Sequence, residues 1–407
     1  MTRETMVNLV TWNSDTTYAL GLYRILAGIL GIWPPKCQDV FSKIQVGILN
    51  EIYRQVSMLV SLIGEVSHDG SAMNDVVEVI SLLSCAVLAL LKVLVLRGCR
   101  SKMLEFVTAA VEDWNAVKSP KARKIMMGHA KIGRCVCIFQ MTSAYVTTIP
   151  MILVPLPFLA PSVNFTGING SETPTRGLPL RTVSIFGDMS DFTYTLVFIL
   201  QAFQILATCT GNIGNDVYFF GVTLHLCGQF RTLGEDLRSF DIDVDETIRR
   251  RKFGELVERH IKLSKLAKYL DDCFNFIILI QLSANSLQII FFVSGIQMIL
   301  SLKLGDTVTV VNTIVVIYVM GLQLFLYSYA GDRLSSEIDN LKVSAYFLPW
   351  YDLPPRLAKD VLIMIMRNHK SFNITAGKIY RIDIENFKNF IKGLGTYFSV
   401  LRIMLDA

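Results

Sequence analysis

The chain has 407 residues, of which 52% are hydrophobic and only 18% are charged, and its formal net charge is +5. Soluble globular domains carry about 25% charged residues, so this chain lacks the charged surface that a soluble protein of its length needs. Its mean hydropathy is +0.45, and its basic residues lie in loops between apolar segments rather than in one patch. These properties argue against a soluble enzyme or a nucleic-acid-binding protein and favour an all-α membrane protein.

The N-terminal segment, residues 1–43, precedes the first apolar segment. Residues 1–15 contain no apolar run followed by a small-residue cleavage site, so no cleaved signal peptide is expected. The first membrane span is then predicted to act as an uncleaved anchor.

Seven apolar segments are predicted to span the membrane, because a helix needs about 20 residues to cross ~30 Å of hydrocarbon. They are residues 44–64, 76–96, 132–158, 192–220, 274–302, 308–329 and 387–405. The first is the weakest, because Glu51 and Arg54 interrupt it; these two can pair on a helix, and an interfacial helix is the alternative. The last carries Lys388, Lys392 and Arg402, so it is expected to line a wet path or to pack against other chains.

The basic residues indicate the orientation of the chain. The loops at 97–131, 231–268 and 333–381 are rich in Lys and Arg, whereas those at 65–75, 159–191 and 303–306 hold none, two and one. Short loops rich in Lys and Arg stay in the cytoplasm. The N-terminus is therefore predicted inside and the C-terminus outside.

Two sequons lie in the loop predicted to be outside, and they give an independent indication of the same orientation. Asn164 and Asn169 each begin an Asn-x-Ser/Thr triplet, the acceptor sequence for N-glycosylation on an external surface. Both are predicted to be glycosylated. A third sequon, at Asn373, falls in a segment predicted to be cytoplasmic and is expected to stay unmodified.

No pattern of catalytic, metal-binding or cofactor-binding residues is found in the sequence. The eight cysteines lie in predicted spans or on the predicted cytoplasmic side, so no external disulfide is expected. Cys135 and Cys137 are two apart, which places them on different faces of a helix and favours packing over metal binding. The five histidines are scattered, and no Gly-rich loop precedes a Lys-Ser/Thr pair. We therefore expect no enzymatic activity, no cofactor and no metal.

The last third of the chain contains short runs in a characteristic order. They are YSYAGDRLSSE (327–337), AYFLPWY (345–351), MIMRNHK (364–370), ITAGK (374–378) and TYFSVL (396–401). This order closely resembles the C-terminal signature of the insect odorant receptors. GIWP at 31–34, and the spacing of Asp216, His225 and Gln229, also resemble that family's pattern. The resemblance covers nearly the whole chain and is most specific at the C-terminus.

The resemblance implies seven transmembrane helices, a cytoplasmic N-terminus, an extracellular C-terminus and a cytoplasmic layer of anchor helices. Spans one to six would occupy residues 44–330, the anchor helices 331–386 and a pore-lining span seven 387–407. The loop at 231–268 is too short for the co-receptor's long insertion, so a ligand-specific subunit is implied. Such a subunit would bind a small volatile odorant and form a heterotetrameric, non-selective cation channel with the odorant co-receptor. It would lie in the plasma membrane of sensory neuron dendrites.

The family's functional positions can be carried onto this sequence. The odorant pocket would lie in the outer half of spans two, three, four and six, with candidate residues Ser81, Met141, Tyr145, Thr148, Tyr194, Phe198, Ile317 and Tyr318. For each of these, simple helix packing is the alternative. Val400 and Met404 are four apart on one helix face and match pore-facing positions, although Arg402 departs from the uncharged surroundings expected of a cation pathway. Tyr346, Trp350 and Tyr351 form an aromatic patch in the predicted inter-subunit anchor.

Three other classes of membrane protein agree less well with the sequence. The insect gustatory receptors share the implied fold, but their Thr-Tyr signature is followed by Gln-Phe, which is missing after Thr396 and Tyr397. A G-protein-coupled receptor has the opposite orientation and an acidic-Arg-Tyr triplet that is not found here. A secondary transporter often shows an internal repeat, and none is found in the sequence.

Overall fold

The computed structural model describes residues 12–33, 73–153, 163–166, 172–175, 178–179, 190–243, 245–301, 307–367 and 372–406. The predicted first span at 44–64 and the sequon residue Asn169 lie outside these ranges. The described helices are α2 (Ser14–Ile29), α4 (Met73–Gly98), α5 (Arg100–Ala116), α6 (Pro120–Leu153), α8 (Asp191–Arg238), α9 (Glu246–Ser301), α10 (Thr307–Tyr346), the short 3-10 helix η1 (Trp350–Asp352), α11 (Pro355–Arg367) and α12 (Ile384–Asp406). Two small hairpins pair β1 (Val163–Thr166) with β2 (Glu172–Thr175), and β3 (Thr375–Ala376) with β4 (Tyr380–Arg381), both antiparallel.

Four of the described helices are long and apolar enough to cross a membrane. They lie at Pro120–Leu153, Asp191–Arg238, Glu246–Ile290 and Thr313–Tyr346. Each overlaps with one of the spans predicted from the sequence. The predicted spans at 76–96 and 387–405 lie on α4 and α12.

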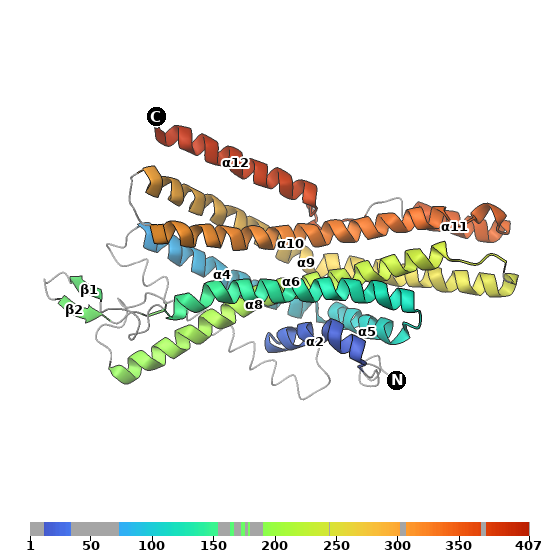
Figure 1. Ribbon diagram of the computed structural model, residues 1–407, viewed down its shortest axis with the longest axis horizontal. Coiled ribbons are helices and arrows are strands. Elements are labelled where there is room, and N and C mark those ends of the chain that lie inside the picture. Colours follow the sequence, from blue (N-terminus) through green and yellow to red (C-terminus); the bar gives the residue numbers. More distant parts are fainter. Residues whose placement is uncertain are drawn as a thin grey trace.

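The long helices continue far beyond their apolar parts and run along the long axis of the molecule (Figure 1). α8 has 48 residues and α9 has 56; at about 1.5 Å per residue they are more than twice as long as the ~30 Å hydrocarbon core. The segments predicted as basic loops are therefore largely helical extensions of the spans. Between α8 and α9 the chain turns where Asp241 Oδ1 accepts a hydrogen bond from the Asp243 amide at 3.0 Å.

Helix α2 was not predicted from the sequence, and it packs against α6 and α8. Its N-cap is Asn13, whose side chain accepts a hydrogen bond from the Thr16 amide at 2.7 Å. The buried ring of Tyr23 lies directly on the backbone of α8 at Gly221, where an added Cβ would collide with the ring. Glycine at this position therefore allows the close approach of α2 to the bundle.

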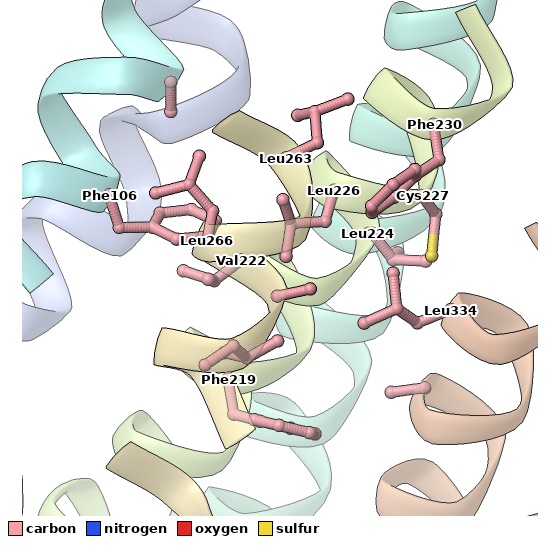
Figure 2. Close-up of a cluster of buried hydrophobic side chains, with 14 of the residues drawn as sticks. Phe106, Phe219, Val222, Leu224, Leu226, Cys227, Phe230, Leu263, Leu266 and Leu334 are labelled. Carbon is pink, nitrogen blue, oxygen red and sulfur yellow. The ribbon is translucent and has the colours of Figure 1, made fainter. Parts of the chain in front are cut away.

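The hydrophobic core is centred on the middle of α8. Phe219, Leu226 and Phe230 are almost completely buried there, and Figure 2 shows them together with Phe106 of α5 and Leu334 of α10. The middle of α8 is therefore surrounded on several sides, whereas its first part, like α6 and α10, presents apolar residues to the outside of the bundle.

The two ends of the molecule differ in structure. The hairpin β1–β2 lies at one end, and α11 lies at the other (Figure 1). α12 packs on α9 and α10 near its start, where Phe387 meets Phe325 at a ring-centroid distance of 5.7 Å. It then leans away from the bundle (Figure 1), and the described side chains from Gly395 onward are exposed.

Candidate functional site

A cavity of about 250 Å³ lies inside the bundle, between α4, α6, α8, α9 and α10. Part of its wall is apolar, with Leu88, Met151, Ile205 and Met320 among the lining side chains. The rest is unusually polar for the interior of a membrane protein. Five of the lining residues are amides, namely Asn212, Gln281, Asn285, Gln288 and Gln323.

Three of these amides form a hydrogen-bonded network between α9 and α10. Gln281 Nε2 donates to Asn285 Oδ1 at 2.7 Å and to Gln323 Oε1 at 3.2 Å. Asn285 Nδ2 donates to Gln323 Oε1 at 3.2 Å and to the Met320 carbonyl oxygen at 3.4 Å. Because unpaired polar groups are costly away from water, this network favours one relative placement of α9 and α10.

The opposite wall is formed by α4, α6 and α8. Asn212 Nδ2 donates to the Cys85 carbonyl oxygen at 3.3 Å, which joins α8 to α4. The hydroxyl of Thr148 donates to the Ala144 carbonyl oxygen at 2.8 Å and lies 3.4 Å from the Cys209 sulfur. Hydroxyls, thiols and an amide thus face the amide network across the cavity.

An ion pair lies beside this wall, one helical turn further along α8. Lys92 Nζ of α4 is 2.6 Å from Asp216 Oδ1, and it also donates to the Asn212 carbonyl oxygen at 3.2 Å. The Tyr327 hydroxyl of α10 donates to the same Asp216 oxygen at 2.5 Å. Since the carboxylate is held from two sides, it links α4, α8 and α10 next to the cavity.

The hairpin β3–β4 directly precedes α12 in the chain, and in the fold it packs on α9. Asp271 accepts hydrogen bonds from the backbone amide and the hydroxyl of Thr375, both at 2.9 Å, and from Lys378 Nζ. Lys378 Nζ also lies 2.8 Å from Asp272, and the Gly377 amide donates to the Asn275 carbonyl oxygen at 2.9 Å. Burial works to lower the pKa of Lys378, but its two aspartate partners raise that pKa on balance. The hairpin is therefore firmly held on α9 immediately before α12 begins.

The predicted anchor residues are exposed. Tyr346 and Tyr351 are 64% and 72% exposed, and Trp350 is 39% exposed. Together with Phe347 they form an aromatic patch where α10 ends and η1 begins. Exposed apolar groups of this kind mark interaction surfaces.

The predicted pore residues lie on the part of α12 that leans away from the bundle. Val400 is 51% exposed, and a Cβ added at Gly393 would meet nothing within 4 Å. The side chains of Arg402 and Met404 lie outside the described part of the chain.

The residues predicted to line the pocket are dispersed in the structure. Thr148 lines the cavity. Ile317 packs on a neighbouring apolar cluster, and Met141 packs against the main core. The Tyr145 hydroxyl pairs with Thr210 at 2.8 Å.

Three further candidates, Tyr194, Phe198 and Tyr318, lie elsewhere on the helices. Tyr194 and Phe198 pack on each other near the start of α8, with ring centroids 6.2 Å apart. Tyr318 is 55% exposed. The side chain of Ser81 lies outside the described part of the chain.

The amides of the cavity wall were missed by sequence reasoning. Gln281 and Asn285 come from α9, a span that the resemblance did not include in the pocket. Polar side chains inside apolar spans are expensive and usually functional, so these amides were the available signal.

No metal site is found in the described part of the chain, where no group of three or more His, Cys, Asp and Glu could hold an ion. Cys137 is buried and Cys135 is exposed, so the two thiols lie on different faces of α6. His225 Nε2 lies 3.3 Å from Asp113, which ties α8 to α5.

The chain is similar to a known protein family and to members of it. The family model for the 7tm Odorant receptor matches residues 72–395. Odorant receptor 10 of Aedes albopictus is 22% identical over 238 residues, which cover 56% of this chain and 61% of that protein; this chain therefore spans about three-fifths of that relative's length. Odorant receptor 22c of Drosophila melanogaster is 20% identical over 398 residues, covering 94% of this chain and 96% of that protein.

The fold is similar to that of a solved structure. The insect olfactory receptor OR5 from Machilis hrabei matches with a TM-score of 0.70 at 16% identity, over 95% of this chain and 99% of that one. The structure of OR5 in complex with eugenol matches with a TM-score of 0.69. The chain therefore has the seven-helix membrane fold that the sequence resemblance implied. With more than half of its length matched by the family model, it belongs to the seven-transmembrane odorant receptor family of insects.

Proposed function

We propose that this chain is the odorant-binding subunit of an odour-gated, non-selective cation channel and that the volatile binds in the 250 Å³ cavity. The cavity is the observation that carries the proposal. Sites for drug-sized ligands measure about 300–1,000 Å³, so this volume suits a smaller molecule. Its apolar side would bind a volatile by burial, and its amides would orient it.

The orientation in the membrane follows from charge and is supported by the shape of the molecule. The basic segments around α5, α11 and the turn between α8 and α9 would lie in the cytoplasm. The hairpin that carries Asn164 and the C-terminal end of α12 both lie away from α11 in Figure 1. Glycosylation at Asn164 and Asn169 would then be extracellular.

The partner is the odorant co-receptor, and the assembly is a heterotetramer in the plasma membrane of sensory dendrites. Residues 331–386 form the cytoplasmic anchor layer in this proposal. The exposed patch of Tyr346, Trp350 and Tyr351 supports a contact there, because aromatic residues are enriched at protein interfaces.

The pore is lined by α12, with Val400 and Met404 near its outer end. The second half of α12 supports this role, since its described side chains from Gly395 onward are exposed on the single chain and are available to line a shared path. Apolar rings in a pore can gate by dewetting. Arg402 would point toward lipid headgroups, away from the cation path.

A route from ligand to pore runs along α9. Gln281 and Asn285 contact the cavity on the same helix on which Asp271 holds the β3–β4 hairpin. A movement of α9 on ligand binding would therefore be transmitted to the start of α12.

Co-expression tests the proposal. Cells that contain both this chain and the co-receptor should give cation currents to a panel of volatiles, while cells that contain this chain alone should give almost none. Thr148→Trp should remove the response by filling the cavity, whereas Val146→Trp, on the exposed face of α6, should leave it intact. If Thr148→Trp reaches the cell surface and responds normally, the cavity is not the binding site.

A further inference from the structure

Gln281 and Asn212, which both line the cavity, each have a buried amide oxygen that has no hydrogen-bond partner within the described part of the chain. The two oxygens are Gln281 Oε1 on α9 and Asn212 Oδ1 on α8. The side chains are 1% and 7% exposed. A buried acceptor without a donor is destabilising by about 1–3 kcal/mol, so a ligand that supplies a donor would gain from pairing with either oxygen.

The assignment of oxygen and nitrogen is determined by neighbouring backbone carbonyls, which can only accept hydrogen bonds. The Cys85 carbonyl faces the amide nitrogen of Asn212 and leaves its oxygen unpaired. The Met320 carbonyl requires the nitrogen of Asn285, so Asn285 must present its oxygen to Gln281. The amide nitrogen of Gln281 therefore donates to the oxygen of Asn285, and the Gln281 oxygen itself is left without a donor. Turning any of these amides would place two acceptors against each other.

Several donors of the wall are already used. Both protons of the Gln281 amide are engaged by Asn285 and Gln323, and both protons of Asn285 by Met320 and Gln323. The hydroxyls of Thr147 and Thr148 each donate to the Ala144 carbonyl at 2.8 Å. The free capacity of the Gln281 side chain is therefore for accepting hydrogen bonds, and Asn212 likewise offers an unpaired oxygen.

The charge of the wall limits which donor can bind. No Asp, Glu, Lys or Arg is among the residues that line the cavity in the described part of the chain. The nearby Asp216 carboxylate is not among the lining residues, and its charge is already balanced by Lys92. An ammonium or a carboxylate would therefore enter without a counter-charge, which is expensive away from water.

We propose that this receptor is tuned to neutral hydroxyl compounds, small alcohols or phenols, whose O–H donates to Gln281 Oε1 or Asn212 Oδ1. The inference rests on the proposed function, because it takes the cavity as the odorant site. Esters, ethers, ketones and hydrocarbons of the same size would fill the cavity but leave both oxygens unpaired.

The test compares volatiles that differ only in the donor. Cells expressing this chain and the co-receptor would be given a panel of neutral alcohols and phenols, each paired with its methyl ether. We expect the most effective alcohol or phenol to act at a concentration at least about threefold lower than its ether. Equal potency of the ethers, in cells that respond to volatiles, would overturn the inference and leave the proposed function standing. Silence to every volatile, with both subunits at the surface, would contradict the proposed function itself.

Substitutions test whether the preference for the alcohol over its ether depends on the two oxygens. Gln281→Met and Asn212→Leu each remove one acceptor from a different wall, so a folding defect in one leaves the other informative. In at least one of the two variants, the ratio between the effective concentrations of the ether and the alcohol should fall toward one. Gln140→Met is the matched control, because Gln140 is also a buried amide without partners but lies outside the cavity wall. If both cavity variants are expressed and keep the full preference, the assignment of the two oxygens is wrong.

Discussion

Lys92 and Asp216 form an ion pair inside the helix bundle, with 2.6 Å between Nζ and Oδ1 and side-chain exposures of 1% and 4%. The pair joins α4 to α8 beside the cavity. The Tyr327 hydroxyl of α10 donates a hydrogen bond to the same Asp216 oxygen and so ties α10 to the pair. A buried charge pair is not by itself a large source of stability, because desolvation offsets most of the attraction. Its effect is to penalise any arrangement in which one of the two charges loses its partner.

Replacement of Lys92 by Met should therefore destabilise the protein strongly. It leaves Asp216 as an unpaired buried charge, and such single removals destabilise proteins by about 3–5 kcal/mol. The double replacement Lys92→Met with Asp216→Leu should recover much of the loss. Thermal unfolding of purified protein would measure both.

The control for this prediction is an exposed ion pair. Arg251 and Glu255 on α9 are 3.6 Å apart and 76% and 67% exposed, so Arg251→Gln should change the unfolding temperature little. A double variant as unstable as Lys92→Met would show that the side chains act through their shape and hydrogen bonds rather than through paired charge.

Gly331 on α10 should tolerate no side chain. An added Cβ would press on the Ile382 carbonyl oxygen, which belongs to the backbone just before α12 and cannot move aside as a side chain can. Gly331→Ala should lower the unfolding temperature and the odour-evoked current together. Gly321→Ala on the same helix is the matched control, because its Cβ would meet nothing within 4 Å; it should be neutral or slightly stabilising, by up to ~1 kcal/mol. Equal effects of the two variants would mean that the contact with Ile382 is unimportant.

The helices were more predictable from the sequence than their ends. Apolar segments reveal spans because hydrocarbon demands apolar side chains over a set length. Nothing comparable marks where α8 ends, since no Pro interrupts it after the apolar part and its residues continue to pack in the core, with Phe230 and Leu233 buried, until the helix ends at Arg238. α2 was missed because its role depends on a distant partner, Gly221, that only the fold brings to Tyr23.

The composition of the cavity wall could not be predicted from the sequence. The sequence placed an odorant pocket among the spans, and of its eight candidate residues Thr148 lines the cavity that the structure contains. The aromatic candidates lie elsewhere because packing with neighbours sets the rotation of each helix: Tyr318 is on the outer face of α10, whereas Gln323 lines the cavity. Hydrophobicity describes a whole segment and does not determine which of its faces turns inward.

Asp271 should be more important for gating than its neighbour Asp272. Asp271→Ala removes the acceptor of the Thr375 amide, the Thr375 hydroxyl and Lys378, so the hairpin before α12 should loosen by about 1–3 kcal/mol. The maximal odour-evoked current per surface receptor should fall. Asp272→Ala removes only the ion pairs to Lys378 and Lys102. Because the Asp272 carboxylate is partly exposed to solvent, the loss of these pairs should have a smaller effect. Equal maximal currents in Asp271→Ala and the unmodified receptor would argue against coupling through the hairpin.

The aromatic patch should affect assembly and not the fold of the single chain. Tyr351 is 72% exposed, so Tyr351→Ala removes little internal packing, whereas the nearby Leu348 is 1% exposed and Leu348→Ala should destabilise the chain by about 2–5 kcal/mol. Tyr351→Ala should therefore reduce co-purification with the co-receptor while the chain alone unfolds at an unchanged temperature. Leu348→Ala should lower that temperature. If Tyr351→Ala assembles normally, the patch is not an essential part of the contact, because truncating a central aromatic residue of an interface commonly weakens binding by more than ~1 kcal/mol.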